Sequence, residues 1–331
     1  MLNIYTGKED IDKQRYVFSQ IRRQDLDTGR KQTIFLIVPD QFTLETERSA
    51  FEYMEAPAFI NPVVLSMSRL AVKVLAETGV STEHIDRYGN YMLLARLLYR
   101  NKDGLELYRG LEKSTTFISQ LSEAIMNLKS HMVEPEALTK CAAEWPVFLE
   151  NDAEIEEGSV LLGRKLRDVS TLYSEYEATL SKNIPDSTDI IRKFAQRITD
   201  SKILANAIIW VYGFDYFSPL NLTAVGAMAC RAAEVNVALT AEIGNPFFSL
   251  TNGMAEALAE AAEKAGAKAE IKTIQKDSAD RQIACSYLPD DKKPAEVAHI
   301  EKELFSGQEV RQFLFKNFLL LLLAFSPFIH F

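Results

Sequence analysis

The chain has 331 residues, 47% hydrophobic and 25% charged, which is enough for one large globular domain or two smaller ones. Its 37 basic and 46 acidic residues give a net charge of −9, which excludes a protein that grips nucleic acid by overall charge and leaves only a local groove for that role. Three widely spaced cysteines, Cys141, Cys230 and Cys285, and the lack of a basic and then apolar opening predict a reducing, cytoplasmic compartment, no bound metal and no secretory signal.

The first 40 residues predict a β-α-β unit. Residues 2–5 form a short apolar run, and Ile11, residues 16–18 and Ile21 recur with helical spacing after it. Residues 33–38 are a continuous β-branched and aromatic run ended by Pro39. Such a run is typical of a strand buried on both faces, as in a parallel sheet.

The turn between this strand and helix has the spacing of a phosphate-binding loop with most of its chemistry removed. A working loop reads G-x-x-x-x-G-K-[ST], because the glycines let backbone N–H groups converge on phosphates. Gly7 and Lys13 remain, but Asp12 replaces the second glycine and Gln14 replaces the hydroxyl residue. We therefore expect tight binding of ATP and Mg²⁺ to be lost, and the alternative is an ordinary acidic turn that matches the pattern by accident.

The next elements continue an α/β pattern. Polar residues 40–45 follow the second strand, where α/β sheets place binding residues, and a helix to Met54 is expected after them. Residues 63–67 predict a third strand. Ser68 is predicted to cap a helix that runs from Arg69 to about Glu77 and ends at Gly79.

The apolar residues from about 86 to 200 fall on helical spacings. The most regular stripe has steps of three and four residues and comprises Leu162, Leu166, Val169, Tyr173, Tyr176 and Leu180. We expect this stripe to pack against neighbouring helices, and a partner coiled coil is the lesser alternative because fewer than four heptads are present.

The strand signal returns at residues 207–212. Ser218 and Pro219 predict the start of a helix, residues 235–240 a strand, residues 254–264 a helix and residues 269–274 an edge strand. The sequence therefore predicts an α/β fold with a parallel sheet interrupted by an all-helical insertion. The expected parts are residues 1–80 and 206–305 for the sheet and 81–205 for the insertion, an arrangement typical of one motor core of a helicase-like ATPase.

The last segment, residues 306–331, is an apolar tail unlike the rest of the chain. Residues 313–331 hold one charge, Lys316, and have about the minimum length of a membrane span. A tail anchor is one interpretation. We favour the other, that the chain is cut short and the tail is not native to the fold, and we expect no membrane partner.

Three blocks of sequence resemble the N-terminal part of the AddB/RexB family, the second subunit of bacterial AddAB (RexAB) helicase–nucleases. They are residues 34–47 (IFLIVPDQFTLETE), 64–75 (VLSMSRLAVKVL) and 209–219 (IWVYGFDYFSP). The helical stretch between the second and third blocks is similar to the family's insertion, and the match extends to about Phe305.

The resemblance implies a P-loop NTPase fold of the superfamily-1 helicase type that has lost its motor and holds DNA. The positions that match the family's contacts to the DNA backbone are Gln41, Thr43, Ser66, Ser68 and Arg69. Hydroxyls, an amide and an Arg bind phosphates without reading sequence. Tyr212 stands where the family often has an Asp, so the acid on the Mg²⁺ side also looks lost.

The resemblance also implies a role in double-strand break repair by homologous recombination, an AddA-type helicase–nuclease subunit as partner, and single-stranded DNA or a duplex end as ligand. The family's nuclease domain and iron–sulfur cysteines lie in a C-terminal part beyond this chain, so we assign no catalytic residue and no iron–sulfur cluster here. The alternatives are an ATP-binding motor fragment, in which Lys13 still holds phosphates, and a tail-anchored interaction protein.

Overall fold

A parallel six-stranded sheet forms the centre of the computed structural model, which describes residues 1–274 except 9–10, 55–59, 150–156 and 181–183. The strands are β1 (Leu2–Gly7), β2 (Ile34–Ile37), β3 (Val63–Leu65), β4 (Ile208–Val211), β5 (Glu234–Thr240) and β6 (Ala269–Thr273). Their order across the sheet is β3-β2-β4-β5-β1-β6, and every neighbouring pair is parallel. The predicted α/β class with a parallel sheet is confirmed, and all six predicted strands are present.

Ten α-helices connect the strands of the described chain. They are α1 (Lys13–Asp27), α2 (Thr43–Tyr53), α3 (Met67–Glu77), α4 (Arg87–Asn101), α5 (Thr115–Ser130), α6 (Pro135–Leu149), α7 (Glu157–Leu180), α8 (Ser187–Arg197), α9 (Pro219–Arg231) and α10 (Ser249–Lys264). Single turns of 3₁₀ helix lie at Asp40–Phe42, Ile198–Asp200 and Pro246–Phe248.

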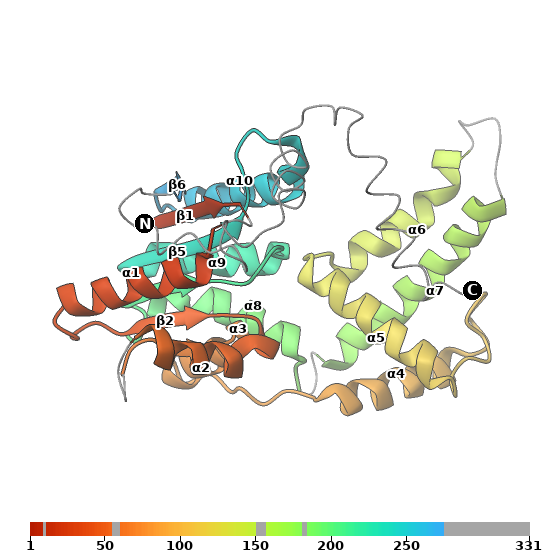
Figure 1. Cartoon of the computed structure of the whole chain (residues 1–331). Coiled ribbons are helices and arrows are strands. Elements are labelled where there is room, and N and C mark those ends of the chain that lie inside the picture. Colours follow the sequence, from red (N-terminus) through yellow and green to blue (C-terminus); the bar gives the residue numbers. More distant parts are fainter. Residues whose placement is uncertain (9–10, 55–59, 150–156, 181–183, 275–331) are drawn as a thin grey trace, which may run out of the picture.

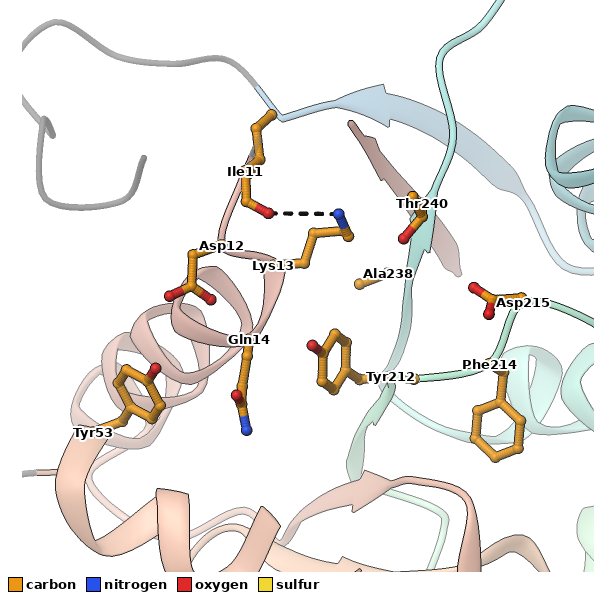
Figure 2. Close-up of a pocket in the computed structure, with 11 residues that line it drawn as sticks. Ile11, Asp12, Lys13, Gln14, Tyr53, Tyr212, Phe214, Asp215, Ala238 and Thr240 are labelled. Atoms are coloured by element: carbon orange, nitrogen blue, oxygen red, sulfur yellow. Dashed lines mark hydrogen bonds between the residues drawn. The ribbon is translucent and has the colours of Figure 1, made fainter. Parts of the chain in front are cut away.

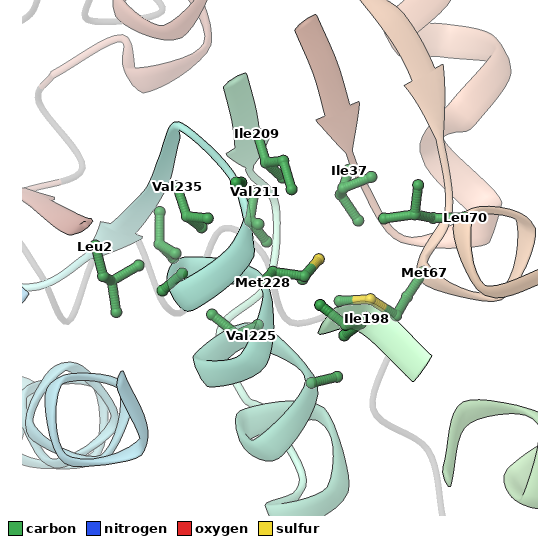
Figure 3. Packing of buried hydrophobic residues seen from close by; sticks show 14 of the residues in the cluster. Leu2, Ile37, Met67, Leu70, Ile198, Ile209, Val211, Val225, Met228 and Val235 are labelled. Carbon is green, nitrogen blue, oxygen red and sulfur yellow. The ribbon is translucent and has the colours of Figure 1, made fainter. Parts of the chain in front are cut away.

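The sheet is covered on both faces, which explains the continuous apolar strands. Along β2, Ile34 and Leu36 pack with α1 and α2, whereas Phe35 and Ile37 pack on the opposite face. That opposite face is the larger core, and it is covered by α3, α8, α9 and α10. Figure 3 shows Leu70 of α3 and Met228 of α9 directed at the strands. Met228 of α9 and Leu70 of α3 lie in it and are fully buried.

Helices α4 to α7 form a second core of their own, beside the sheet (Figure 1). Leu94 and Leu97 of α4, Ile125 of α5 and Tyr173 of α7 are each at most 1% exposed. Helix α8 behaves differently, because its Ile190 and Phe194 lie in the larger core under the sheet. The helices that pack around the second core therefore end with α7 at Leu180, whereas the expected helical insertion extends to residue 205.

Two sequence predictions need correction. Ser68 does not cap α3. Its N-cap is Ser66, whose hydroxyl accepts a hydrogen bond from the N–H of Arg69 at 3.4 Å, because the helix starts directly after β3. In the stripe of α7, Tyr173, Tyr176 and Leu180 are buried as expected, but Leu162 is 40% exposed. The N-terminal part of α7 therefore does not bury the whole stripe.

In the part of the chain that the structure describes, no helix has both the length and the apolar character needed to cross a bilayer. The apolar tail predicted at residues 306–331 lies outside the described residues.

Candidate nucleic-acid interface and phosphate-loop site

The candidate site residues all lie at one edge of the sheet. Because the strands are parallel, their carboxyl ends meet at the same edge, where α/β proteins bind ligands. The loops that begin there start at Lys8 after β1, Val38 after β2, Ser66 after β3 and Tyr212 after β4. Gly213 has a φ of 81°, and a Cβ on it would lie 3.3 Å from Cδ of Pro39, so the loops after β2 and β4 pass close together.

Lys13 of the phosphate-loop pattern is turned into its own loop. Its Nζ donates a hydrogen bond to the carbonyl of Lys8 at 2.7 Å and lies 3.5 Å from the carbonyl of Ile11 (Figure 2). The side chain is only 8% exposed. The ammonium of Lys13 therefore binds two main-chain carbonyls of the turn in which a working loop would hold a phosphate.

Asp12 has a structural role at the same turn. It is the N-cap of α1, and its Oδ1 accepts a hydrogen bond from the N–H of Arg15 at 2.9 Å. A carboxylate thus lies at the helix N-terminus, where a phosphate oxygen would otherwise meet the free N–H groups. Gly7, the remaining glycine of the pattern, ends β1, and a Cβ there would lie 3.3 Å from Cδ1 of Ile11.

A pocket of about 350 Å³ adjoins this turn. It is lined by Ile11, Asp12, Lys13, Gln14, Tyr53, Tyr212, Gly213, Phe214, Asp215, Ala238 and Thr240. Figure 2 shows that its aromatic side chains come from different segments, with Tyr53 on α2 and Tyr212 and Phe214 after β4. The lining holds two carboxylates against one ammonium, so its formal charge is negative.

The second group of candidate residues lies on the loops after β2 and β3, and hydrogen bonds join these loops. Ser68 donates to Oδ1 of Asp40 at 3.2 Å, and the hydroxyls of Ser66 and Ser68 are 2.9 Å apart. Thr43 donates to the carbonyl of Asp40 at 3.0 Å. The structure therefore brings residues 40–43 and 66–69 together, although more than 20 residues separate the two segments.

Exposure divides the five predicted DNA contacts into two sets. Gln41, Ser68 and Arg69 are exposed, whereas Thr43 and Ser66 are 8% and 1% exposed and use their hydroxyls inside the protein. Thr43 and Ser66 thus shape the two loops, and only the three exposed residues offer side chains to a ligand. Gly7 and Lys13 belong to a separate part of the edge, because β4 and β5 lie between β2 and β1.

Sequence reasoning missed Asp40 and Asp215. Asp40 is exposed beside Ser68 and adds a negative charge to the predicted phosphate surface, and Asp215 lines the pocket. Both residues follow a predicted strand within a few positions, and this position could have indicated that they lie at the carboxyl edge.

Fold and site together define an α/β protein with a fully parallel sheet, whose candidate binding residues lie on the loops at the carboxyl edge. Residues 4–288 match the family model described as ADDB, N-terminal, and the chain belongs to this family. The resemblance predicted from the three sequence blocks is therefore confirmed.

Its relatives include proteins named as a subunit of an ATP-dependent helicase/deoxyribonuclease. That of Alkaliphilus metalliredigens is 29% identical over 87% of this chain, and that of Desulforudis audaxviator is 29% identical over 92%. That of Geobacillus thermodenitrificans is 30% identical over 73%. The matches cover 25%, 25% and 20% of these relatives, so the chain spans about a quarter of their length.

Proposed function

We propose that this chain is the DNA-holding, motor-inactive helicase-like part of an AddAB-type helicase–nuclease that repairs double-strand breaks by homologous recombination. The relatives are named as subunits of an ATP-dependent helicase/deoxyribonuclease, which supports an AddA-type subunit as partner. In this proposal the sheet is a P-loop NTPase fold of the superfamily-1 type, and helices α4 to α7 are its insertion.

The observation that carries the loss of the motor is the position of Lys13. Its Nζ is held by the carbonyls of Lys8 and Ile11, and the adjacent N-cap is already taken by the carboxylate of Asp12. A positive charge attracts the phosphates of a nucleotide, whereas a carboxylate a few Å away repels them. These residues do not fit a Mg²⁺-bound triphosphate, so we derive no step through ATP.

Binding of DNA is supported by the exposed polar surface between the loops after β2 and β3. Gln41, Ser68 and Arg69 offer an amide, a hydroxyl and a guanidinium, groups that bind phosphate oxygens without reading bases. Arg69 lies in the first turn of α3, whose N-terminal N–H groups also favour an anion. The surface is small, which predicts weak binding of single-stranded DNA with little sequence preference.

One observation favours the second candidate, an ATP-binding motor fragment. Lys13 lines a pocket of about 350 Å³ at the carboxyl edge of a parallel sheet, the place where such folds bind nucleotides. In this candidate Lys13 would leave its loop carbonyls when a nucleotide enters. A Mg-ATP titration separates the two candidates.

The experiment for DNA holding is fluorescence anisotropy with a labelled single-stranded oligonucleotide at rising salt. Arg69→Ala should weaken binding to all sequences about equally and reduce the salt slope by about 0.7, the value for one phosphate contact on a single strand. The control is Arg23→Ala on α1, because Arg23 is exposed and pairs with Asp27 on the same helix. No binding by the unmodified chain would refute DNA holding. An Arg69→Ala variant with unchanged affinity would show that DNA binds at another surface.

A further inference from the structure

Helix α4 carries positive charge without any acid. Residues 87–101 include Arg87, Arg96 and Arg100 and no Asp or Glu, in a chain whose net charge is −9. The helix packs on α5 and α7 through Leu94, Leu97 and Leu98, which are at most 1% exposed. Its three arginines are exposed, so the exposed surface of this helix is unlike the acidic average of the protein.

Five of the six exposed residues of α4 form a stripe, which we call the α4 stripe: Tyr88, Met92, Arg96, Tyr99 and Arg100. The sixth is Arg87 at the start of the helix. Tyr88 is 73% exposed, Met92 75% and Tyr99 60%. Positions 88, 92, 96 and 100 are each one turn apart, so they lie on one side of the helix. From Tyr88 to Arg100 the stripe is about 18 Å long.

The arginines of this stripe differ from those around them in having no carboxylate partner. Between residues 81 and 205 the chain has five other arginines outside α4, and each pairs with an acid: Arg109 with Asp103, Arg164 and Arg167 with Glu106, Arg192 with Glu134, and Arg197 with Asp200. In the described structure, Arg96 and Arg100 are exposed and form no ion pair. Their charges are therefore available to an anion.

Tyr99 lies between Arg96 and Arg100 in the sequence, Tyr88 lies two turns before Arg96, and a cation lies near the ring of Tyr99. Nζ of Lys102 is 4.9 Å from the ring centre of Tyr99, and Tyr88 meets Tyr91 edge to face at 6.5 Å, where Arg87 covers the ring of Tyr91. An exposed ring beside a cation offers a stacking surface for a base next to a charge for its phosphate.

We propose that the α4 stripe is a second binding surface for single-stranded DNA, in which Arg96 and Arg100 contact the phosphate backbone and Tyr88 and Tyr99 stack on bases. A polyanion supplies negative charge continuously along the length of the stripe, which matches guanidinium groups one helical turn apart. The exposed rings of Tyr88 and Tyr99 on the same stripe match bases, and this pairing of aromatic and cationic groups is typical of surfaces that hold single strands. The inference rests on the proposed DNA-holding function and adds a site to it.

The test is anisotropy of a fluorescein-labelled oligo(dT) of about 20 nucleotides, longer than the roughly 4–16 nucleotides that single-strand binding folds occupy, with the whole 331-residue chain over a series of salt concentrations. The double variant Arg96→Ala/Arg100→Ala should lose roughly tenfold in affinity at low salt and reduce the salt slope by about 1.4. The variant Tyr88→Ala/Tyr99→Ala should also lose roughly tenfold, but without a change in slope, because stacking releases no counterions. Arg96→Lys/Arg100→Lys should keep the slope.

The matched control removes two exposed lysines from other helices, Lys140→Ala/Lys264→Ala, each paired with a Glu one turn away. If the arginine variant behaves like this control while the unmodified chain binds oligo(dT), the inference is overturned and the proposed function stands; the stripe would then suit an acidic protein surface. If the unmodified chain does not bind oligo(dT) at all, both fail. Circular dichroism of each variant checks that the exposed substitutions leave the helices intact.

Discussion

The ammonium of Lys129 lies 2.6 Å from Oδ2 of Asp186, and neither side chain has any exposed surface. Lys129 belongs to α5 and Asp186 is the N-cap of α8, so this pair joins the helices of the second core to a helix that packs under the sheet. Glu177 and Asp189 also reach the ammonium, at 2.6 and 2.9 Å. Three carboxylates therefore surround one cation at the junction of the two cores.

The first prediction concerns this pair. Lys129→Met should lower the free energy of unfolding by about 3–5 kcal/mol, because it leaves Asp186 buried and charged without its partner. Urea denaturation followed by circular dichroism measures the change. Lys140→Met is the control, since Lys140 is 76% exposed and its pair with Glu144 is worth less than about 1 kcal/mol. Equal midpoints for the two variants would show that the buried pair is not needed for stability.

The second prediction follows from the surplus of acid around Lys129. Burial raises the pKa of the Glu177 carboxyl above its ordinary value of 4.5, the ion pair with Lys129 lowers it, and the two neighbouring aspartates raise it further. Folded protein thus holds this proton more tightly than unfolded protein, so the contribution of Glu177 to stability falls as pH rises from 4.5 through the raised pKa. Glu177→Gln should remove that fall.

Urea denaturation of the variant and the unmodified chain at several pH values between about 4.5 and 7 tests this prediction, over the range in which a raised Glu pKa titrates. The difference in unfolding free energy should shift in favour of the variant as pH rises. A constant difference across the range would mean that Glu177 titrates alike in the folded and unfolded chain.

The strands were predictable from sequence because their apolar runs are continuous, but their order was not. Residues 207–212 and 235–240 read as buried strands, yet nothing local to them indicates that β4 and β5 lie between β1 and β2. The pairing of parallel strands depends on how the connections through α1 and α9 cross the sheet, and this is a property of the tertiary structure. The cap of α9 at Ser218 and Pro219 was predicted correctly, because both residues act within one turn.

The place of the candidate residues in the fold was predictable, and their contacts were predictable only in part. The pattern placed residues 40–45 at the carboxyl edge, and the family resemblance pointed to residues 66–69; the structure has both segments at that edge. Sequence spacing could not reveal that Ser66 and Thr43 use their hydroxyls internally, because that depends on contacts between segments. The buried Lys129 was also missed, although the sequence Asp186-Ser187-Thr188-Asp189 has the pattern of the capping box that places Asp186.

A third prediction tests the packing that supports the sheet. A Cβ on Gly226 of α9 would lie 2.4 Å from the carbonyl oxygen of Ala261 in α10, so the two helices touch at this glycine. Gly226→Ala should destabilise the protein by about 1–3 kcal/mol because the backbones must separate. Gly253→Ala on α10 is the matched control, since nothing lies within 4 Å of that position. It should stabilise by about 0.5–1 kcal/mol through helix propensity. Thermal unfolding of both variants tests this prediction. Midpoint temperatures that shift in the same direction would contradict the close contact between the two helices.

The fourth prediction concerns the phosphate-loop pattern. We expect Mg-ATP to bind no better than about millimolar, a binding free energy of about −4 kcal/mol, because Lys13 is held by its own loop and Asp12 occupies the N-cap of α1. Asp12→Gly/Gln14→Thr should improve binding at little cost to the fold, since Gly replaces Asp at an N-cap for a few tenths of a kcal/mol. Titration calorimetry measures both proteins. A micromolar dissociation constant for the unmodified chain would favour the motor candidate.

The fifth prediction concerns Asp40, the acid that lies among the proposed DNA contacts. Its carboxylate is exposed and accepts a hydrogen bond from Ser68 at 3.2 Å, so a phosphate that approaches Ser68 or Arg69 meets a negative charge. Asp40→Asn keeps an acceptor for Ser68 and removes that charge. Single-stranded DNA should then bind a few-fold more tightly at low salt, about 1 kcal/mol for a screened surface charge a few Å away.

The gain should shrink as salt rises, because screening removes the repulsion in the unmodified chain as well. Glu260→Gln on α10 is the control for the loss of one acidic charge, since Glu260 is exposed and pairs with Lys264 far along the chain from both loops. Anisotropy titrations of the three proteins at low and high salt provide the comparison. If Asp40→Asn and Glu260→Gln change the affinity equally, DNA senses only the overall charge and does not lie on the loops after β2 and β3.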